Sequence, residues 1–308
     1  MIEVSVILLV YNHQRFLRKA IESVLMQETT FRYEVVIGDD ASTDGSENII
    51  KEYQTNYPDI ITLIQQKANS GIFVNLGSCL SKCKGKYIAL LEGDDYWCDK
   101  RKLQIERDYL ANHQQNSAVA HNYVLVDSNS NVIRTGLETK KLVDYNITEM
   151  EKFRLPSQTS TLMIRNITSS ISQHELQIIK AYSWMPADRL FAILLLKHGK
   201  ITVIPKVMSA YRYYIENNGT NWSSQHHVNS IEANLERYRI MCGMESLSEE
   251  VDIHLNLSNV KEYILKKTIS EGSTSDQKWK YYWLCVRMLL SDRKRLRMLS
   301  KIIFKHVW

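Results

Sequence analysis

The segment Val4–Val10 reads VSVILLV, and the polar pair Tyr11-Asn12 follows it directly. A short run of Val, Ile and Leu without regular alternation is typical of a strand that is buried on both faces, as in a parallel sheet. The next segment, Arg15–Gln27, places its apolar residues at helical spacing. The chain therefore opens with a buried strand followed by an amphipathic helix.

The same alternation of strand and helix continues as far as Leu91. Further strands are expected at Glu34–Gly38, Ile60–Gln65 and Tyr87–Leu91, and further helices at Ser46–Tyr57 and Asn75–Lys84. This pattern predicts a doubly wound α/β domain with helices on both faces of the sheet. Ligands of such sheets bind at the carboxyl ends of the strands.

The rest of the chain is less regular. Strands are expected at Ala118–Val126, Ser160–Ile164 and Ile201–Ile204, where Pro205 ends the last of them, and a helix at Asp188–His198. Beyond about residue 228 the pattern is mostly helical, which predicts a helical C-terminal extension.

The excess of basic residues is concentrated near the C-terminal end of the chain. The 308 residues include 39 Lys and Arg against 34 Asp and Glu, a net charge of +5. The segment 276–308 contains nine basic and two acidic residues, a net charge of +7, so the remainder is slightly acidic. We therefore expect no nucleic-acid partner. The composition also excludes a disordered chain, a collagen and a long coiled coil.

The basic segment has the pattern of an amphipathic helix. Arg293, Arg297, Lys301 and Lys305 recur every four residues, and apolar residues gather on another side of the helix. Such a helix is typical of contact with an anionic membrane surface. The alternative is packing on the body of the protein or in a homodimer.

The cysteines and the N-terminal residues indicate in which cellular compartment the protein is expected. The five cysteines form no C-x-x-C pair, which argues against a disulfide framework or a zinc ribbon. Met1-Ile2-Glu3 lacks the basic start of a secretory signal, and no apolar run reaches the roughly 20 residues that span a bilayer. We expect a cytoplasmic protein, peripheral on the inner face of the cell membrane.

The acidic pair Asp94-Asp95 follows the expected strand Tyr87–Leu91. Adjacent carboxylates repel each other, and a hard divalent cation such as Mg²⁺ or Mn²⁺ removes that cost. The alternative is a helix N-cap, which explains only one of the two acids. Asp39-Asp40, at the end of another strand, are equally suited to capping and to contact with a ligand.

Several motifs in order resemble those of the family 2 glycosyltransferases, which have the GT-A fold and include bacterial enzymes of polysaccharide, O-antigen and capsule synthesis. The matching residues are Val4-Ser5-Val6-Ile7 with Tyr11-Asn12, Asp39-Asp40-Ala41-Ser42-Thr43-Asp44-Gly45-Ser46, Asn69-Ser70-Gly71 with Asn75, Gly85-Lys86-Tyr87, and Glu92-Gly93-Asp94-Asp95 leading to Lys102-Leu103. The resemblance is specific over about residues 3–105, weaker to about 225 and absent beyond.

The resemblance implies a division of the chain and a role for each motif. Residues 1–115 would form the nucleotide-sugar-binding half of a Rossmann-like mixed sheet, 116–227 the acceptor half, and 228–308 the helical region. The implied donor-binding residues are Tyr11 as a base platform, Asp40 on the base with Asp39 beside it, Asp94 near the ribose, and Asn12, Asn69 and Asn75 in the same motifs. Asp95 would hold Mn²⁺ or Mg²⁺ on the diphosphate of the donor.

The chemistry implied is inverting transfer of a sugar to a hydroxyl of a glycan or of a polyprenyl-linked acceptor. Asp188 lies where the family places its general base, although helix capping is its alternative role. UDP is the expected nucleotide by analogy with the family alone. Candidate acceptor residues are Trp97, Trp184 and Trp222, for which packing is the alternative, and Thr161, for which a simple polar strand edge is the alternative.

One motif departs from the family pattern. Many relatives have Tyr-Arg-x-His where this chain has Tyr211-Arg212-Tyr213-Tyr214. Tyr214 thus replaces a histidine that would contact the metal or the diphosphate, and His226 or His227 is the candidate substitute. Arg212 is a candidate phosphate partner, with a surface salt bridge as the alternative.

Three other classes of function compete with this interpretation. A catalytically weak glycan-binding or scaffold protein would retain the fold, and the Tyr214 departure favours it. A nucleotidyltransferase would need further acidic and basic residues that are not evident. A dinucleotide oxidoreductase is disfavoured, because no G-x-G-x-x-G follows the first strand.

Overall fold

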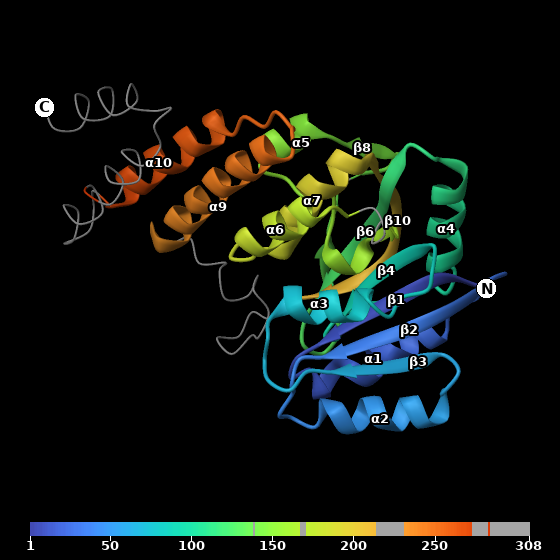
Figure 1. Ribbon diagram of the computed structural model, residues 1–308. Helices are drawn as coiled ribbons and strands as arrows, with labels where there is room; N and C mark the ends of the chain where they lie inside the picture. Colours follow the sequence, from blue (N-terminus) through green and yellow to red (C-terminus); the bar gives the residue numbers. More distant parts are fainter. Residues whose placement is uncertain (138, 167–170, 214–230, 273–282, 284–308) are drawn as a thin grey trace, which may run out of the picture.

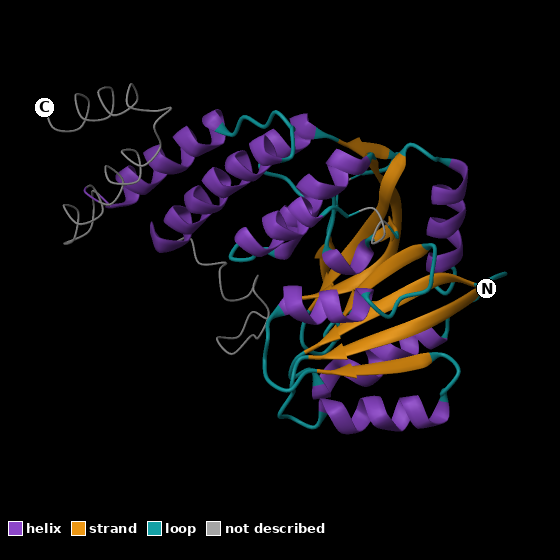
Figure 2. Cartoon of the chain, viewed as in Figure 1, coloured by secondary structure: helices purple, strands orange, loops and turns teal. Residues whose placement is uncertain are grey.

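The computed structural model describes residues 1–137, 139–166, 171–213, 231–272 and 283. Within these ranges ten strands form a single mixed sheet, ordered β3-β2-β1-β4-β9-β6-β10-β5, with β7 beside β6 and β8 beside β10 (Figures 1 and 2). The strands are β1 (Ile2–Val10), β2 (Arg32–Asp39), β3 (Ile61–Gln65), β4 (Tyr87–Glu92), β5 (Tyr96–Trp97), β6 (Asn116–Val126), β7 (Val132–Thr135), β8 (Val143–Tyr145), β9 (Met163–Arg165) and β10 (Lys200–Arg212).

The helices occupy both faces of this sheet. They are α1 (Gln14–Leu25), α2 (Ser46–Asn56), α3 (Ile72–Leu80), α4 (Lys102–Asn112), α5 (Ile147–Glu151), α6 (Gln173–Ala181), α7 (Ala187–His198), α9 (Ile231–Glu250) and α10 (Ser258–Gly272), with a 3₁₀ turn η1 at Thr159–Thr161. Helices α1, α2 and α4 pack on one face, and α3 and α7 on the other (Figure 1). The doubly wound α/β fold predicted from the sequence is confirmed.

Strand β1 shows why the sheet must be covered on both sides. Val6 and Leu8 contribute to the core under α1 and α2, while Ile7 and Leu9 contribute to the core under α3. From Val4 to Val10 every residue of the strand is buried. The absence of alternation in VSVILLV therefore reflects burial on both faces.

The strand order places a cleft at one edge of the sheet. Strand β1 pairs in parallel with β2 on one side and with β4 on the other, so that the chain winds in opposite directions from β1. In open α/β sheets, the crevice at the carboxyl ends of the strands beside such a reversal binds ligands. The polar segments after β1, β2 and β4 all lie at this edge.

The second half completes the same sheet. Strand β9 runs antiparallel between β4 and β6, and β10 pairs in parallel with β6. Two expected boundaries were wrong. The segment Thr159–Thr161 is a 3₁₀ turn and strand β9 starts at Met163, while β10 continues through Pro205 to Arg212. Register shifts around Pro205 accommodate the residue, which cannot donate a ladder hydrogen bond.

Helices α6 and α7 form a hairpin that determines where Asp188 lies. Ser172 and Glu175 form a capping box at the start of α6, which satisfies its first backbone N–H groups. Glu175 also contacts Lys197 Nζ at 2.9 Å and His198 Nε2 at 3.0 Å, at the end of α7. These contacts tie the end of α7 to the start of α6, so the first turn of α7 lies beside the end of α6.

The predicted helical extension is present as α9 and α10, which pack on α7 through a separate core that includes Tyr238, Met241, Met244 and Leu265. None of the helices in the described part of the chain has both the length and the apolarity needed to cross a bilayer. The division of the chain into a nucleotide-sugar-binding half, an acceptor half and a helical region, with boundaries at residues 115 and 227, stays a prediction. The predicted basic helix of segment 276–308 lies outside the described residues, apart from Trp283.

Candidate active site

A polar cavity of about 240 Å³ lies at the carboxyl ends of β1 and β4, against the start of α3. Four residues predicted to bind the donor line it: Tyr11, Asp40, Asn69 and Asn75. Tyr11 is 42% exposed, so its ring is accessible to a planar ligand. The remaining lining residues are Leu9, Val10, His13, Gly71, Ile72 and Glu92.

Asp40 fixes one wall of the cavity. Its Oδ1 accepts hydrogen bonds from the backbone N–H of Ser70 at 2.8 Å and from the Ser70 hydroxyl at 2.7 Å, and its Oδ2 accepts from the N–H of Gly71 at 2.8 Å. These bonds hold the loop that leads into α3. Both oxygens are engaged with the protein, so the structure gives Asp40 a role in shaping the wall.

Asn12, Asp39 and Asn75 also support the backbone around the cavity. Asn12 has a φ of 57°, and its Oδ1 accepts from the N–H of Thr43 at 2.8 Å. The Asn75 amide donates to the carbonyl of Gly38 at 2.9 Å. Asp39 is fully buried, which raises the pKa of its carboxyl, and its Oδ2 has no hydrogen-bond partner among the described residues. Of these three residues only Asn75 lines the cavity.

Two cavity residues, His13 and Glu92, were not among the predicted site residues. His13 follows the Tyr11-Asn12 motif, and its buried Nδ1 has no hydrogen-bond partner in the part of the chain that the structure describes. A Cβ at Gly93 would lie 2.7 Å from this nitrogen, so a glycine between Glu92 and Asp94 is required. Glu92 could have been recognised as a site residue from the sequence, because it ends the strand that leads to the acidic pair Asp94-Asp95.

Glu92, Asp94 and Asp95 form an acidic cluster at the end of β4. Burial, and secondarily the charge of Asp94, raise the pKa of Glu92 to about 8, and the charge of Asp188 contributes in the same direction. Burial and the charges of Asp94 and Glu92 also raise the pKa of Asp95. The raised pKa values of Glu92 and Asp95 thus reflect burial together with the repulsion between carboxyls that crowd at the end of β4.

The two members of the acidic pair have different surroundings. Asp95 is 2% exposed, its Oδ2 accepts from the Ser160 hydroxyl at 2.6 Å, and its Oδ1 accepts from the N–H of Arg212 at 2.8 Å. The Asp94 carboxylate accepts no hydrogen bond from the described residues. The two oxygens of Asp95 thus join β4 to η1 and β10, and its role as metal ligand stays a prediction, because each carboxylate oxygen has a further lone pair.

Arg212 is a buried residue, so the alternative of a surface salt bridge does not apply to it. It is 1% exposed, its Nε donates to the carbonyl of Asp94 at 2.8 Å, and its Nη1 donates to the carbonyl of Asp127 at 2.7 Å. Its guanidinium also lies 4.1 Å from the centre of the Phe16 ring. Arg212 thus holds the segment that carries the acids, and the prediction of a direct phosphate contact is not supported by this geometry.

Asp188 lies in the first turn of α7. The influence of the Asp188 charge on the pKa of Glu92 places the two carboxyls in the same electrostatic neighbourhood. One turn later, Phe191 packs against Phe73 of α3, with ring centroids 5.9 Å apart. The helix that carries Asp188 is therefore in contact with the helix that begins at the polar cavity.

The surroundings of Asp188 suit proton transfer. Its Oδ1 accepts from the N–H of Arg189 at 2.7 Å, and its Oδ2 accepts from none of the described residues. Burial raises the pKa of Asp188 above its ordinary value of 3.8, although the charge of Arg189 opposes this shift. A carboxylate with one anchored and one unengaged oxygen can accept a proton from a hydroxyl group.

The predicted acceptor residues do not gather at the cleft. Trp97 is 1% exposed and donates to the carbonyl of Ser160 at 2.9 Å, and Thr161 is fully buried. Trp97 therefore cannot stack on a sugar, and Thr161 is too buried to line an acceptor cleft, which corrects both predictions. Trp184 is 41% exposed, and Arg239 lies over its ring at 4.5 Å. Tyr214, Trp222, His226 and His227 lie outside the described residues.

A divalent cation fits the chemistry of the acidic cluster. Within the described ranges, no three His, Cys, Asp or Glu side chains are grouped as a ready-made metal centre. The hard carboxylate oxygens of Asp94 and Glu92, and the charge that raises the pKa of Glu92, nonetheless fit a cation that arrives with its own waters and an anionic substrate. The residues present are therefore compatible with the predicted Mn²⁺ or Mg²⁺.

Solved structures with the same architecture define the class of the fold. The chain is similar to Staphylococcus aureus TarS in complex with UDP-GlcNAc, with a TM-score of 0.61, 18% identity and coverage of 94% of this chain and 80% of that one. It is also similar to the mannosyltransferase PcManGT of Pyrobaculum calidifontis in complex with GDP-Man and Mn²⁺, with a TM-score of 0.54, 14% identity and coverage of 97% and 83%. The protein has the GT-A glycosyltransferase fold.

Sequence comparison gives the family. The model of glycosyl transferase family 2 matches residues 5–171, and the chain belongs to this family. It is 30% identical over 213 residues to the uncharacterized protein Rv1520 of Mycobacterium tuberculosis, covering 68% of this chain and 58% of that protein. It is 39% identical over 125 residues to the putative glycosyltransferase EpsE of Bacillus subtilis, covering 41% and 44%. The chain thus spans well under two thirds of the length of these curated relatives.

Proposed function

We propose that this protein is an inverting, metal-dependent glycosyltransferase. It moves a sugar from a nucleoside-diphosphate donor, with UDP as the first expectation, to a hydroxyl of a glycan or lipid-linked oligosaccharide. The observations that carry the proposal are the effect of the Asp188 charge on Glu92, a member of the acidic cluster of β4, and the cavity that Glu92 lines together with four of the predicted donor-binding residues. Membership of family 2 and the nucleotide sugar in the TarS structure support it.

The cavity suits the nucleotide part of the donor. The accessible ring of Tyr11 would stack on the base, and the loop that Asp40 holds would form the wall beside it. Asn69 and Asn75 line the same space. The carboxyl of Glu92, protonated at neutral pH because its pKa is raised to about 8, would donate a hydrogen bond to a ribose or phosphate oxygen when no cation is bound.

The diphosphate would lie at the acidic cluster. Asp95, with Asp94 and Glu92 beside it, would hold the cation, while Arg212 keeps the end of β4 in place. When bound, a divalent cation neutralises the negative charge that develops on the leaving diphosphate. His13, which packs on Gly93, limits the space at this point and helps to orient the substrate.

Asp188 would act on the acceptor. Its carboxylate takes the proton of the acceptor hydroxyl as the oxygen forms a bond to the anomeric carbon, and the bond from that carbon to the diphosphate breaks with its electron pair on the leaving oxygen. Attack from the face opposite the leaving group inverts the anomeric configuration. The hydrogen bond from Arg189 N–H restricts the rotation of the carboxylate.

A donor screen tests this proposal. We expect the purified protein to release nucleoside diphosphate from at least one UDP-, GDP- or dTDP-sugar in the presence of MnCl₂, and EDTA to abolish the release. Asp94→Asn should lower the rate by about 100-fold or more, because it removes a charged ligand from the cation. The measurement is the nucleoside diphosphate formed per enzyme per minute.

The matched control is Asp59→Asn, which makes the same chemical change at an exposed position before β3. Its rate should equal that of the wild type. Glycan binding without turnover of any donor would instead favour a binding or scaffold protein. Full turnover in EDTA would contradict the role given to the cation.

A further inference from the structure

Ser160 connects the turn η1 to the acidic cluster through both its side chain and its backbone. Its hydroxyl donates to Asp95 Oδ2 at 2.6 Å and accepts from the backbone N–H of Glu92 at 3.2 Å. Its carbonyl accepts from Trp97 Nε1 at 2.9 Å. Ser160 is 1% exposed, so solvent does not compete for these bonds. A serine 65 residues away from Asp95 in the sequence thus contacts three residues of the segment 92–97.

The two bonds of the Ser160 hydroxyl determine where its proton points. A hydroxyl has one proton and two lone pairs, whereas a backbone N–H group can only donate. The N–H of Glu92 therefore occupies a lone pair of Ser160 Oγ, and the single proton is directed at Asp95 Oδ2. An ionised carboxylate only accepts, so this arrangement suits the charged form of Asp95, which is the form that binds a hard cation.

The Asp95 carboxylate is fixed at both of its oxygens. Oδ1 accepts from the backbone N–H of Arg212 at 2.8 Å, and Oδ2 accepts from Ser160. Two bonds from different elements, β10 and η1, restrict the rotation of the carboxylate about its Cβ–Cγ bond. The second lone pair of each oxygen then has a defined direction in which it can meet a cation. Of the two donors, only the Ser160 hydroxyl belongs to a side chain and can be removed by substitution.

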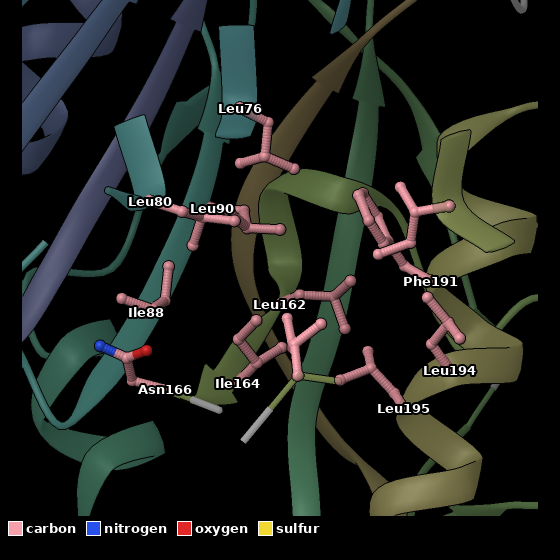
Figure 3. Close-up of a pocket in the computed structure, with 12 residues that line it drawn as sticks. Leu76, Leu80, Ile88, Leu90, Leu162, Ile164, Asn166, Phe191, Leu194 and Leu195 are labelled. Carbon is pink, nitrogen blue, oxygen red and sulfur yellow. The ribbon is translucent and has the colours of Figure 1, made fainter. Parts of the chain in front are cut away.

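The turn that carries Ser160 is itself held in place. The carbonyl of Leu162 accepts from the N–H of Leu90 in β4 at 3.0 Å. The Leu162 side chain lies in an apolar cavity between α3 and α7 (Figure 3). The Thr161 hydroxyl also donates to the carbonyl of Gln158 at 2.6 Å, across the turn. Packing and hydrogen bonds therefore fix the position from which the serine hydroxyl reaches the acidic cluster.

We propose that Ser160 is a positioning residue, which holds the Asp95 carboxylate in the orientation that binds the divalent cation of the donor complex. This inference rests on the proposed function and adds a residue from outside the acidic motif. Ser160 acts through Asp95 and is assigned no contact with the substrate. Hydrogen-bond partners that orient metal ligands commonly contribute about 10–100-fold to metal affinity.

Binding of Mn²⁺ to Ser160→Ala tests the inference. Electron paramagnetic resonance measures free Mn²⁺ as MnCl₂ is added to the protein with UDP and, in a parallel series, with GDP. We expect the variant to bind Mn²⁺ about 10–100-fold more weakly than the wild type, because its Asp95 carboxylate is free to rotate. Calorimetry in EDTA should give the same nucleotide affinity for both proteins, since Ser160 does not line the polar cavity. General damage to the site would lower both affinities.

The matched control is Ser157→Ala, which removes another buried hydroxyl from the same segment. Ser157 is 5% exposed and donates to the carbonyl of His121 at 2.8 Å, so its hydroxyl is directed away from the acidic cluster. Its Mn²⁺ affinity should equal that of the wild type. A loss in Ser157→Ala as large as that in Ser160→Ala would contradict a specific role for Ser160.

The thermal midpoint shows whether Ser160→Ala is folded. If it is not, Ser160→Cys takes its place, because a thiol nearly preserves the volume but is a weak donor, and the same loss of Mn²⁺ affinity is expected. Equal Mn²⁺ affinity of the wild type and a folded Ser160 variant overturns the inference and leaves the proposed function standing. Failure of the wild type to bind Mn²⁺ with either nucleotide contradicts the proposed function itself.

Discussion

Asp188→Asn is expected to lower the rate of sugar transfer by about 10²–10⁴-fold, the range in which a general base contributes. Asparagine has nearly the same shape and can still accept the hydrogen bond from Arg189 N–H, but it cannot take a proton. Donor affinity should stay within about twofold, since Asp188 is assigned to the acceptor. The measurements are initial rates with donor and acceptor, and calorimetric binding of the nucleoside diphosphate.

The same residue predicts how the rate depends on pH. Burial raises the pKa of Asp188, so the ionised form that can accept a proton is lost at a higher pH than for an exposed aspartate. The rate should therefore rise with pH through that pKa and then level off, and Asp188→Asn should lack this rise. Full activity of Asp188→Asn at any pH would contradict its role as the base.

Glu106→Ala is expected to destabilise the fold by about 3–5 kcal/mol, because it leaves a buried lysine without its partner charge. Lys102 and Glu106 are both fully buried, with Nζ 2.8 Å from Oε2, and Glu106 Oε1 lies 2.7 Å from His121 Nδ1. Lys102 Nζ also lies 4.0 Å from the centre of the Trp97 ring. The measurement is the free energy of unfolding in urea.

The effect should reach the active site. Trp97 donates to the carbonyl of Ser160, and the hydroxyl of Ser160 donates to Asp95. Loss of the buried charge pair should therefore loosen the acidic cluster as well as the fold. The double variant Lys102→Met with Glu106→Leu should recover most of the stability, because replacing both buried charges with apolar groups is often neutral or stabilising.

An exposed ion pair provides the control for this prediction. Arg18 and Glu52 form two close contacts but are each about half exposed. Glu52→Ala should cost less than about 1 kcal/mol, since solvent screens such pairs. If Glu52→Ala and Glu106→Ala lowered the free energy of unfolding by similar amounts, burial of the charges would not determine how much stability is lost.

Local patterns in the sequence were sufficient to predict the first half of the fold. The apolar run of β1 and the helical spacing after it depend only on neighbouring residues, and the strand ends then follow from the parallel topology. The polar cavity could be predicted for the same reason. Tyr11, Asp40 and Asn69 each come shortly after a strand that ends at the same edge of the sheet.

The parts that were missed depend on contacts between distant residues. Nothing local distinguishes Asp94 from Asp95, and only the bonds from Ser160 and Arg212 show which carboxylate is engaged. The sequence places Trp97 two residues after Asp95, which suggests a ring that stacks on a sugar. In the structure the ring is buried against the side chain of Lys102. The apolar cavity could not be predicted, because residues of α3 and α7 meet there only through the fold.

The most direct test of the central claim is a crystal structure of the protein grown with UDP and MnCl₂, and a parallel one with GDP. The account predicts electron density for the base beside Tyr11, and for the diphosphate between the acidic cluster and the first turn of α7. A nucleotide bound elsewhere on the molecule, with Asp188 and Asp94 facing away from it, would contradict the account.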